Sequence, residues 1–523
     1  MHACLNVDEI IRLIIHQLVR SRAKATAVAL ACCCKNFEDP VLDVLWETQD
    51  GLLPLLKSLP ADVWNEGGYT VSAPIAHISS SLNSFIRKSF KRPPTTLEWA
   101  RFRMCAQKIR ELRDYGYQSH PSSEVLSVLE HCVVDEPLFP HLKTLELWFV
   151  TGKTIPFIPL FLSPRNTIVK IGFIPSDSPT EMIAQMITAF PTLCPNLQGI
   201  AFNSIPRDPI ITAAVSGILI ANNPNTLRSV YVESPLTEEA LKVIFKLPNL
   251  RELLVIIERD TSLPSMVLPN LTTLVIVYDG DGDWLPMFHE ATFEKLEAVT
   301  FNRRSEQIGD FLETFERVAL DASVQNTLTQ FSLYTSRSWN PNYSSLLRFT
   351  QLTEIIIEFS CNDGCSSRLD DDIITKMARA MPKLEFLVLG DSPCREIPIG
   401  VTVKGLVALA DHCTGLSDLC IHLEADSLRE PPAIIWTPPN VGPTALRRDC
   451  ALKTLVVGEM PMPEGSVPMV ALTIARIFPH LEYIDCVDEN WKRVVDAVRL
   501  QKIVDFSSEH PSLHLEATLM TFP

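Results

Sequence analysis

A few stretches of the sequence place acidic, cysteine or histidine side chains at spacings that could do chemistry. In DGDGDWLPMFHE, the acids at the first, third, fifth and twelfth places match a calcium-binding loop, and they are Asp279, Asp281, Asp283 and Glu290. Such a loop needs glycine at its sixth place, which is Trp284 here, and Pro286 disrupts the eighth. We therefore interpret this stretch as a polar loop between two elements.

The cysteine and histidine spacings support neither a metal site nor a nucleophile. Cys361 and Cys365 have a possible metal-ligand spacing, but no second pair follows closely. The pairs His131–Cys132 and His412–Cys413 are sequence neighbours, which point to different faces of a helix. The motifs for phosphate loops, dinucleotide binding, nucleophile elbows and zinc proteases are absent from the sequence. We expect no catalytic residue, no metal ligand and no cofactor, and hence no enzyme.

The composition favours a globular protein with an uneven charge. Its 523 residues are 46% hydrophobic and 21% charged, which is enough apolar material for a long core. Residues 1–130 hold 15 Lys+Arg and 14 Asp+Glu, so the net charge of -16 comes from the rest of the chain. This acidic excess repels phosphate backbones and favours a basic partner, although solubility is its ordinary role. We therefore expect no nucleic-acid partner.

The expected location is the cytoplasm, the nucleus or both. The first residues carry charges inside their apolar stretch, unlike a signal peptide, and no apolar run is long enough to span a membrane. The 14 cysteines follow no regular framework, which suits reduced thiols in a reducing compartment. We expect no membrane contact.

One short pattern recurs along most of the chain. The stretch FPHLKTLEL at residues 139–147 returns as CPNLQGIAF, LPNLRELLV, LPNLTTLVI, MPKLEFLVL and FPHLEYIDC. Intervals of about 21–36 residues separate the anchors, and each anchor opens an L-x-x-L-x-L strand pattern. We align the repeats on Leu142, Ile168, Leu197, Leu227, Leu250, Leu271, Leu296, Leu328, Leu352, Leu384, Leu416, Leu452 and Leu481.

The segments between these strands have helical spacing, for example Thr180 to Phe190, Thr237 to Phe245, Asp372 to Met381 and Val470 to Phe478. One strand and one helix cannot bury both apolar faces alone, so stacked repeats must share a continuous core. The pattern resembles a leucine-rich-repeat solenoid, which is an α/β fold with a parallel sheet on its concave side and helices on its convex side. A doubly wound α/β enzyme also alternates strands and helices, but it would not repeat this pattern.

Residues 5–46 read as three short helices. We expect Ile10, Ile14, Leu18, Leu30 and Trp46 to form a small core with part of it left for a binding partner. The second helix is expected to end at Phe37 and the third to follow Pro40. The order resembles an F-box, with matching residues at Leu5, Val7, Glu9, Ile10, Ile14, Leu18, Leu30, Cys33, Phe37, Leu45 and Trp46. The family usually starts with Leu-Pro, whereas Asn6 follows Leu5 here. A plain helical cap on the solenoid is the alternative.

The unequal repeats together with these helices resemble fungal F-box proteins with irregular leucine-rich repeats. The resemblance implies a substrate-recognition subunit of an SCF-type E3 ubiquitin ligase, which binds the Skp adaptor and, through it, a cullin. The adaptor contacts would be Leu5, Val7, Ile10, Ile14, Leu18, Leu30, Phe37 and Trp46. The alternative is a repeat scaffold for protein interactions without a ligase link.

This resemblance and the repeat pattern divide the chain into four parts. Residues 1–50 form the helical unit, residues 51–136 a helical and irregular linker with an N-terminal cap, residues 137–490 the solenoid, and residues 491–523 a C-terminal cap. The proline-rich insertion from Leu428 to Asp449 is expected to fold back over the solenoid.

Strand periodicity selects candidate contacts for an unknown protein target. In each strand the fourth and sixth positions point into the core, so the third, fifth and seventh point to the open side. Aromatic residues beside acids favour a target with basic and apolar groups. For Trp148 the alternative is that its side chain packs under the N-terminal linker. The candidates are Glu146, Trp148, Tyr231, Glu233, Tyr334, Glu354, Glu358 and His422.

Overall fold

The structure is a computed structural model. It describes residues 7–21, 23–65, 90–115, 121–132, 137–221, 225–258, 265–279, 291, 293–303, 322–335, 343–359, 369–390, 401–423, 450–458, 462, 464–486 and 488–498. The chain divides into two compact units, residues 1–255 and 256–523, and each is described by itself.

The first unit begins with three helices and continues as strands alternating with helical segments. Its helices are α1 (Asp8–Arg20), α2 (Lys24–Cys33), α3 (Lys35–Glu47), α4 (Leu53–Leu56), α5 (Thr96–Ala106), α6 (Ser123–Cys132), α7 (Thr180–Thr188), α8 (Phe190–Leu193), α9 (Pro209–Ala221) and α10 (Glu238–Ile244). Its strands are β1 (Thr48–Asp50), β2 (Glu111–Asp114), β3 (Thr144–Val150), β4 (Ile168–Phe173), β5 (Gly199–Asn203) and β6 (Ser229–Pro235). Strand β7 (Glu252–Glu258) runs across the boundary between the units.

The second unit repeats the same alternation. Its described strands are β8 (Thr273–Asp279), β9 (Ala298–Arg303), β10 (Gln330–Thr335), β11 (Glu354–Phe359), β12 (Phe386–Leu389), β13 (Asp418–Ile421), β14 (Thr454–Gly458) and β15 (Tyr483–Cys486). Its described helices include α12 (Ala322–Thr327), α13 (Asp371–Ala380), α14 (Val403–His412) and α15 (Val467–Ile477), and residues 489–498 are also helical.

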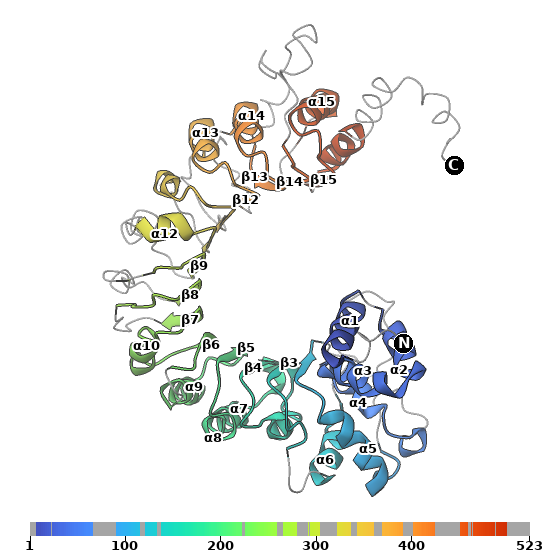
Figure 1. Cartoon of the computed structure of the whole chain (residues 1–523). Coiled ribbons are helices and arrows are strands. Elements are labelled where there is room, and N and C mark those ends of the chain that lie inside the picture. The colour runs from blue at the N-terminus through green and yellow to red at the C-terminus, as the bar shows by residue number, and fades with distance from the viewer. Residues whose placement is uncertain are drawn as a thin grey trace, which may run out of the picture. The chain divides into compact units, whose positions relative to one another are not determined.

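Within each unit the strands pair in chain order, and each pair is parallel. In the first unit the pairing runs from β1 to β6, and in the second from β8 to β15. The helices α7, α9 and α10 of the first unit, like α13, α14 and α15 of the second, lie on one face of their sheet (Figure 1). The fold is therefore the predicted α/β leucine-rich-repeat solenoid with an N-terminal all-α unit.

The anchor residues of the repeats are buried in the core, with one exception. The twelve leucine anchors are between 0% and 3% exposed. Ile168 is wrong as an anchor, because it is the first residue of β4 and pairs with Thr144, which puts its side chain on the open face. The anchor position of that repeat belongs to Asn166, which is 0% exposed. An apolar pattern search passes over a buried asparagine.

Asn166 is tolerated there because its amide is hydrogen bonded on both sides. Its Oδ1 accepts from the backbone N–H of Ser163, and its Nδ2 donates to the carbonyl oxygen of Leu142 at 3.3 Å. The thiol of Cys194 in the next repeat also donates to Oδ1, at 3.7 Å. A buried polar side chain costs little when its donors and acceptors are paired, so this repeat keeps the register with a polar anchor.

The three N-terminal helices have a core of their own, which differs from the predicted one. It consists of Ile11, Ile15, Ala27, Phe37, Val41 and Val44, with Leu18, Leu30 and Leu45 partly buried against it. Ile10 and Ile14, which we expected in this core, are exposed. The apolar face of α1 is wider than its two neighbours can cover, so the stripe of Ile11 and Ile15 is buried and the adjacent stripe is not.

Helix boundaries in this unit also differ from the prediction. Helix α2 ends at Cys33, and α3 begins at Lys35 and contains both Phe37 and Pro40. Pro40 lies close to the start of α3, where its missing N–H removes a single hydrogen bond near the helix end. We predicted a helix boundary at Pro40 because proline usually interrupts a helix, but α3 contains this proline.

The sheet begins directly after α3, within the residues assigned to the helical unit and the linker. The backbone N–H of Arg110 donates to the carbonyl of Glu47 at 2.9 Å, and β1 then pairs with β2. Asp43 on α3 accepts from Arg12 of α1 at 2.7 Å and also from Lys108, which follows α5. The three helices are thus fastened to the first strands of the solenoid.

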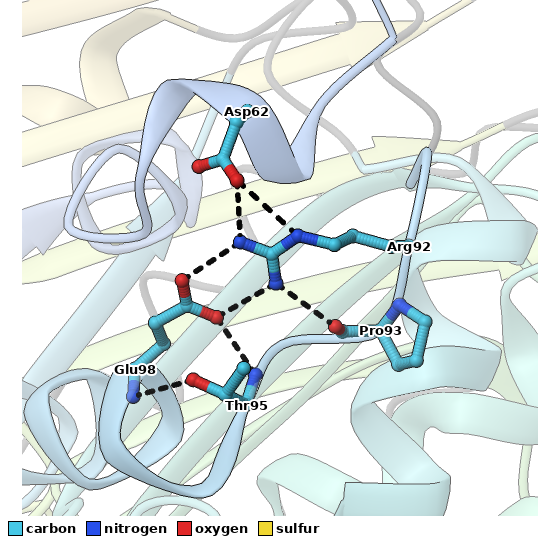
Figure 2. A network of polar contacts seen from close by, with 5 residues as sticks. All are labelled: Asp62, Arg92, Pro93, Thr95 and Glu98. Carbon is cyan, nitrogen blue, oxygen red and sulfur yellow. Dashed lines mark hydrogen bonds and ion pairs between the residues drawn. The ribbon is translucent and has the colours of Figure 1, made fainter.

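Arg92 connects Asp62 and Glu98 by hydrogen bonds, and we call these three residues the Arg92 clamp (Figure 2). Its guanidinium donates to Asp62 at 2.6 Å and to both oxygens of Glu98 at 2.8 and 2.9 Å. Glu98 also forms a capping box with Thr95 at the start of α5. The rings of Trp64 and Phe90 stack at 4.6 Å, so these contacts join the two chain segments that flank residues 66–89.

Candidate functional site

The open face of the first unit carries a groove of about 760 Å³. It extends from Trp148 on β3 to Arg251 and Glu252 at the start of β7. Small residues on β5, Gly199 and Ala201, line it between Trp148 on β3 and Tyr231 on β6. Strand alternation explains which residues line the groove, because those of β4, β5 and β6 are mostly the ones whose side chains point away from the helices.

Trp148 lies over a glycine of the neighbouring strand. A β-carbon at Gly172 would come within 2.7 Å of the indole atom Cε3, so only glycine leaves room for the ring there. The ring of Tyr115, which follows β2, lies 6.5 Å away on the other side. Trp148 is therefore half-buried by its neighbours and still presents part of its ring to the groove.

Two residues beside the groove have left-handed backbone conformations. Among the described residues other than glycine, positive φ is found at Phe149 (60°) and Ser204 (54°). Phe149 follows Trp148 at a register shift between β3 and β4, and Ser204 lines the end of the groove. Bulges and strained residues commonly redirect side chains next to binding sites. This backbone geometry is thus concentrated at the edge of the groove.

The carboxylates near the groove are engaged by groups of the protein itself. Glu146 is 6% exposed, accepts from the hydroxyl of Tyr115 and lies 3.2 Å from the ammonium of Lys170. Burial and this hydrogen bond raise the pKa of Tyr115 to about 12. Glu146 therefore holds Tyr115 and Lys170 in place, which corrects our expectation that it faces a partner.

The two carboxylates that line the groove are also paired internally. Glu233 accepts from the backbone N–H of Ser204 at 2.6 Å, and Glu252 accepts from the hydroxyl of Ser229 at 2.8 Å. Burial, followed by the charge of Glu233, raises the pKa of Tyr231. Tyr231 is therefore a neutral phenol at physiological pH, and it is 37% exposed.

One edge of the groove is basic. A ladder of backbone hydrogen bonds places Lys143, Thr167, Gln198, Arg228 and Arg251 side by side, one from each repeat. Lys143, Arg228 and Arg251 are exposed, and both arginines line the groove. Strand periodicity does not select this position, which lies just before each strand. The signal in the sequence was the residue that follows each anchor leucine.

The candidates in the second unit lie on the open face of its own strands. Tyr334 on β10 pairs in register with Glu358 on β11, and Glu354 pairs with Gln330. Burial and the nearby Glu358 raise the pKa of Tyr334. His422 follows β13 and is half-buried. Tyr334, Glu354 and Glu358 thus form a mixed aromatic and acidic surface on two neighbouring strands.

Helix α1 presents an apolar stripe to solvent. The exposed fractions are 41% for Val7, 36% for Ile10, 68% for Leu13 and 41% for Ile14, and Val28 on α2 is 50% exposed. Of the other predicted adaptor contacts, Phe37 is buried in the helical core, and Leu18, Leu30 and Trp46 are half-buried. Leu5 lies outside the described residues. The stripe therefore consists of residues 7, 10, 13 and 14.

The stretches considered for chemistry remain without a site in the described part of the chain. No group of three or more potential metal ligands is found among the described residues. Cys413 is fully buried while His412 is exposed, as expected for neighbours on a helix. Residues 280–290, the pair Cys361 and Cys365, and the insertion from Leu428 to Asp449 lie outside the described residues. No described helix has the length and apolarity that a membrane span requires.

Comparison with known proteins adds little to this picture. No protein-family model matches the chain, and no curated protein matches it. Among solved structures, an internalin (InlF) of Listeria monocytogenes is 13% identical with a TM-score of 0.29, covering 56% of this chain and 82% of the internalin. TLR13, solved with the single-stranded RNA ssRNA13, is 10% identical with a TM-score of 0.25, covering 73% of this chain and 62% of TLR13. The fold assignment rests on the parallel strands and helices described above.

Proposed function

We propose that the protein is a substrate-recognition subunit of an SCF-type ubiquitin ligase. Its three N-terminal helices bind the Skp adaptor, which connects to a cullin, and the repeats bind a protein target. The contribution to ubiquitin transfer is proximity, because the receptor holds its target near the conjugating enzyme. No residue of the chain takes part in the covalent chemistry.

The exposed apolar stripe on α1 carries this proposal. Ile10, Leu13 and Ile14 face solvent next to one another on one helix, beside the core of the same three helices. Contiguous exposed apolar surface is typical of an interaction site. Burying such a side chain at an interface stabilises it by about 1.5–3 kcal/mol. The stripe lies on the same helices whose residue order resembles an F-box, so its occupant in the proposal is the adaptor.

A binding experiment with purified components tests the proposal. The double variant Ile10→Glu with Ile14→Glu places two charges in the stripe without touching the core. We expect the parent chain to retain the purified Skp adaptor on a column and the double variant to lose it, with an unchanged melting temperature.

Leu97→Glu is the matched control, because Leu97 on α5 is 82% exposed and lies outside the stripe. This variant should retain the adaptor like the parent. Adaptor retention by the double variant, or failure of the parent to bind, would leave an interaction scaffold without a ligase link as the better description.

A further inference from the structure

We infer that the open face of the second unit binds an amphipathic helix of another protein, whose apolar side is bordered by Lys and Arg. The helix lies across strands β11 to β14, over a strip of apolar side chains that these strands present. The inference deepens the proposed function, and it rests on that function insofar as the helix belongs to the target protein.

The apolar strip takes one residue from each of four neighbouring strands. It consists of Ile356, Val388, Cys420 and Val456. Each of these residues is the register partner of the next, so in this parallel sheet their side chains lie next to one another on one face. The residues before and after them in each strand are buried in the core. The strip therefore faces the open side, and its members are only half-buried there.

Carboxylates border this strip. Two residues earlier in the strands, Phe386 lies between its register partners Glu354 and Asp418. At the far end, the exposed Asp485 on β15 is the register partner of Val456. No Lys or Arg occupies an open-face position of the described strands β10 to β15. The strip is thus an apolar surface with an acidic border.

These carboxylates are available to a basic partner. Neither Glu354 nor Asp485 forms an ion pair among the described residues. Asp418 accepts a hydrogen bond from the hydroxyl of Ser417 at 2.5 Å, which is a neutral group and leaves the negative charge uncompensated. The exposed Lys453 precedes β14, and it is a single cation beside three acids. The local charge therefore selects Lys and Arg in the partner.

The charge of the whole unit acts in the same direction. Residues 1–255 hold 24 Lys+Arg and 24 Asp+Glu, which leaves 22 Lys+Arg and 38 Asp+Glu for residues 256–523. The net charge of -16 therefore belongs entirely to the second unit. An excess of one sign attracts a partner of the opposite sign and speeds its association, so a basic segment is favoured before it makes any contact.

The spacing of the strip favours a helix over an extended segment. Neighbouring strands are about 4.8 Å apart, so the four side chains follow a line of about 14 Å. Residues three or four positions apart on an α-helix are about 4.5–6 Å apart along its axis. In an extended segment, side chains on the same face are about 6.8 Å apart. One turn of an amphipathic helix therefore matches one strand of the sheet.

A peptide library with a helical pattern tests the inference on the purified full chain. Phage display sixteen-residue peptides with leucine at alternating intervals of three and four residues, and the other positions vary among Lys, Arg, Asp, Glu, Gln and Ser. Panning should enrich Lys and Arg over Asp and Glu. One enriched peptide is then synthesised with a fluorescent label, and its affinity is measured by polarisation.

Two variants of the strip should weaken this peptide's binding. Val388→Ser removes an apolar contact at the middle of the strip, and we expect a loss of about tenfold in affinity. Glu354→Lys reverses a charge at the border, and we expect a loss of about fivefold. A proline in the middle of the peptide should abolish binding, because proline interrupts a helix.

The first unit provides matched controls. Ile168 is a half-buried aliphatic residue on the open face of β4, and Glu252 is an exposed acid at the start of β7. Ile168→Ser and Glu252→Lys make the same kinds of chemical change outside the strip. Each should bind the peptide within about twofold of the parent, and equal melting temperatures check that all four variants are folded.

Several outcomes would overturn the inference. They are enrichment of acidic peptides, absence of any enrichment, and equal peptide binding by Val388→Ser and the parent. Loss of binding in the double variant Ile10→Glu with Ile14→Glu would instead place the peptide on the α1 stripe. A parent that sediments as a dimer, with Val388→Ser as a monomer, would show that a second copy of the chain covers the strip.

The adaptor is absent from these measurements, and the α1 stripe is unchanged in both strip variants. Val388→Ser and Glu354→Lys should therefore retain the Skp adaptor like the parent. Failure of the helix inference and failure of the adaptor proposal are thus seen separately.

Discussion

The carboxylate of Asp371 on α13 accepts the backbone N–H of Gly405 on α14 at 3.0 Å, across two successive repeats. The same carboxylate accepts from the backbone N–H and the hydroxyl of Thr402 at 2.8 and 2.6 Å. One acid thereby accepts from donors at the start of the next helix, where backbone N–H groups lack the usual partner one turn earlier. This contact fixes the spacing between neighbouring helices of the second unit.

Gly405→Ala should destabilise the protein although alanine favours helices. A β-carbon at Gly405 would lie 2.8 Å from Oδ1 of Asp371 and 3.0 Å from Val401 Cγ1, so the carboxylate must move and lose hydrogen bonds. We expect a net loss of about 1–2 kcal/mol in the free energy of unfolding, measured by urea denaturation.

Gly217→Ala is the control for this variant. Gly217 lies within α9, and a β-carbon there meets no atom within 4 Å. Alanine should therefore raise the free energy of unfolding by about 0.5–1 kcal/mol, which is the difference in helix propensity. If both variants shift stability in the same direction, the Asp371 contact is not what makes glycine necessary at residue 405.

Asn166→Leu tests the polar anchor. Leucine is the usual residue at this position of the repeats, so a consensus argument expects stabilisation. The buried N–H of Ser163 and carbonyl of Leu142 would lose their partners, and each unpaired buried group costs about 1–3 kcal/mol. We expect a lower melting temperature than the parent. A melting temperature equal to the parent's would show that a leucine anchor serves this repeat equally well.

The fold could be predicted from the sequence because the anchor leucines and the strand pattern report directly on burial. The register of β4 could not, because Asn166 replaces the apolar anchor and Ile168 imitates one two residues later. Similarly, Ile10 and Ile11 look alike in the sequence, and only the packing of α2 and α3 decides which is buried. In both cases two nearby positions could hold the buried residue, and an apolar side chain in the sequence does not show which of the two is buried.

The candidate site was predicted in part for related reasons. Periodicity correctly directed Trp148 and Tyr231 to the open face, because alternation along a strand is a local property. It did not indicate that Gly172 lies beneath Trp148, since that contact depends on which strands are neighbours. Nor did it select Arg228, which precedes the strand.

The clamp at Arg92 predicts a specific loss of stability in acid. Hydrogen bonds from Arg92, then from the backbone of Thr95, lower the pKa of Glu98 from 4.5 to about 2. A lowered pKa in the folded state stabilises the protein above the ordinary value, and that stabilisation is lost as pH falls toward the folded-state value. We expect Glu98→Gln to melt below the parent at about pH 6, with the difference shrinking toward about pH 3.

Arg92→Gln should behave in the same way, because it removes the group that lowers the pKa of Glu98. The double variant should then melt at about the same temperature as Arg92→Gln at about pH 6, since Arg92→Gln already removes the guanidinium that Glu98 binds, whereas Glu98→Gln leaves the contact between Arg92 and Asp62 in place. A difference between parent and Glu98→Gln that stays constant across this pH range would mean that the ionised carboxylate is not the stabilising form.

Two glycines on neighbouring strands test how Trp148 is positioned. Gly172→Ala places a methyl group 2.7 Å from the indole, so the ring must move away from its present position. Gly199→Ala on β5 places the same group at ordinary contact distances, 3.5 Å from the nearest atom of Ile168. We expect the first to change the near-ultraviolet circular dichroism and to lower the melting temperature by a few degrees, whereas the second leaves the spectrum unchanged and raises stability slightly. The spectrum separates a displaced tryptophan from a general loss of structure, because far-ultraviolet dichroism should be the same in both variants. Equal spectra for Gly172→Ala and the parent would show that the position of the indole does not depend on glycine at residue 172. The end of the groove at Trp148 would then not be shaped by this glycine.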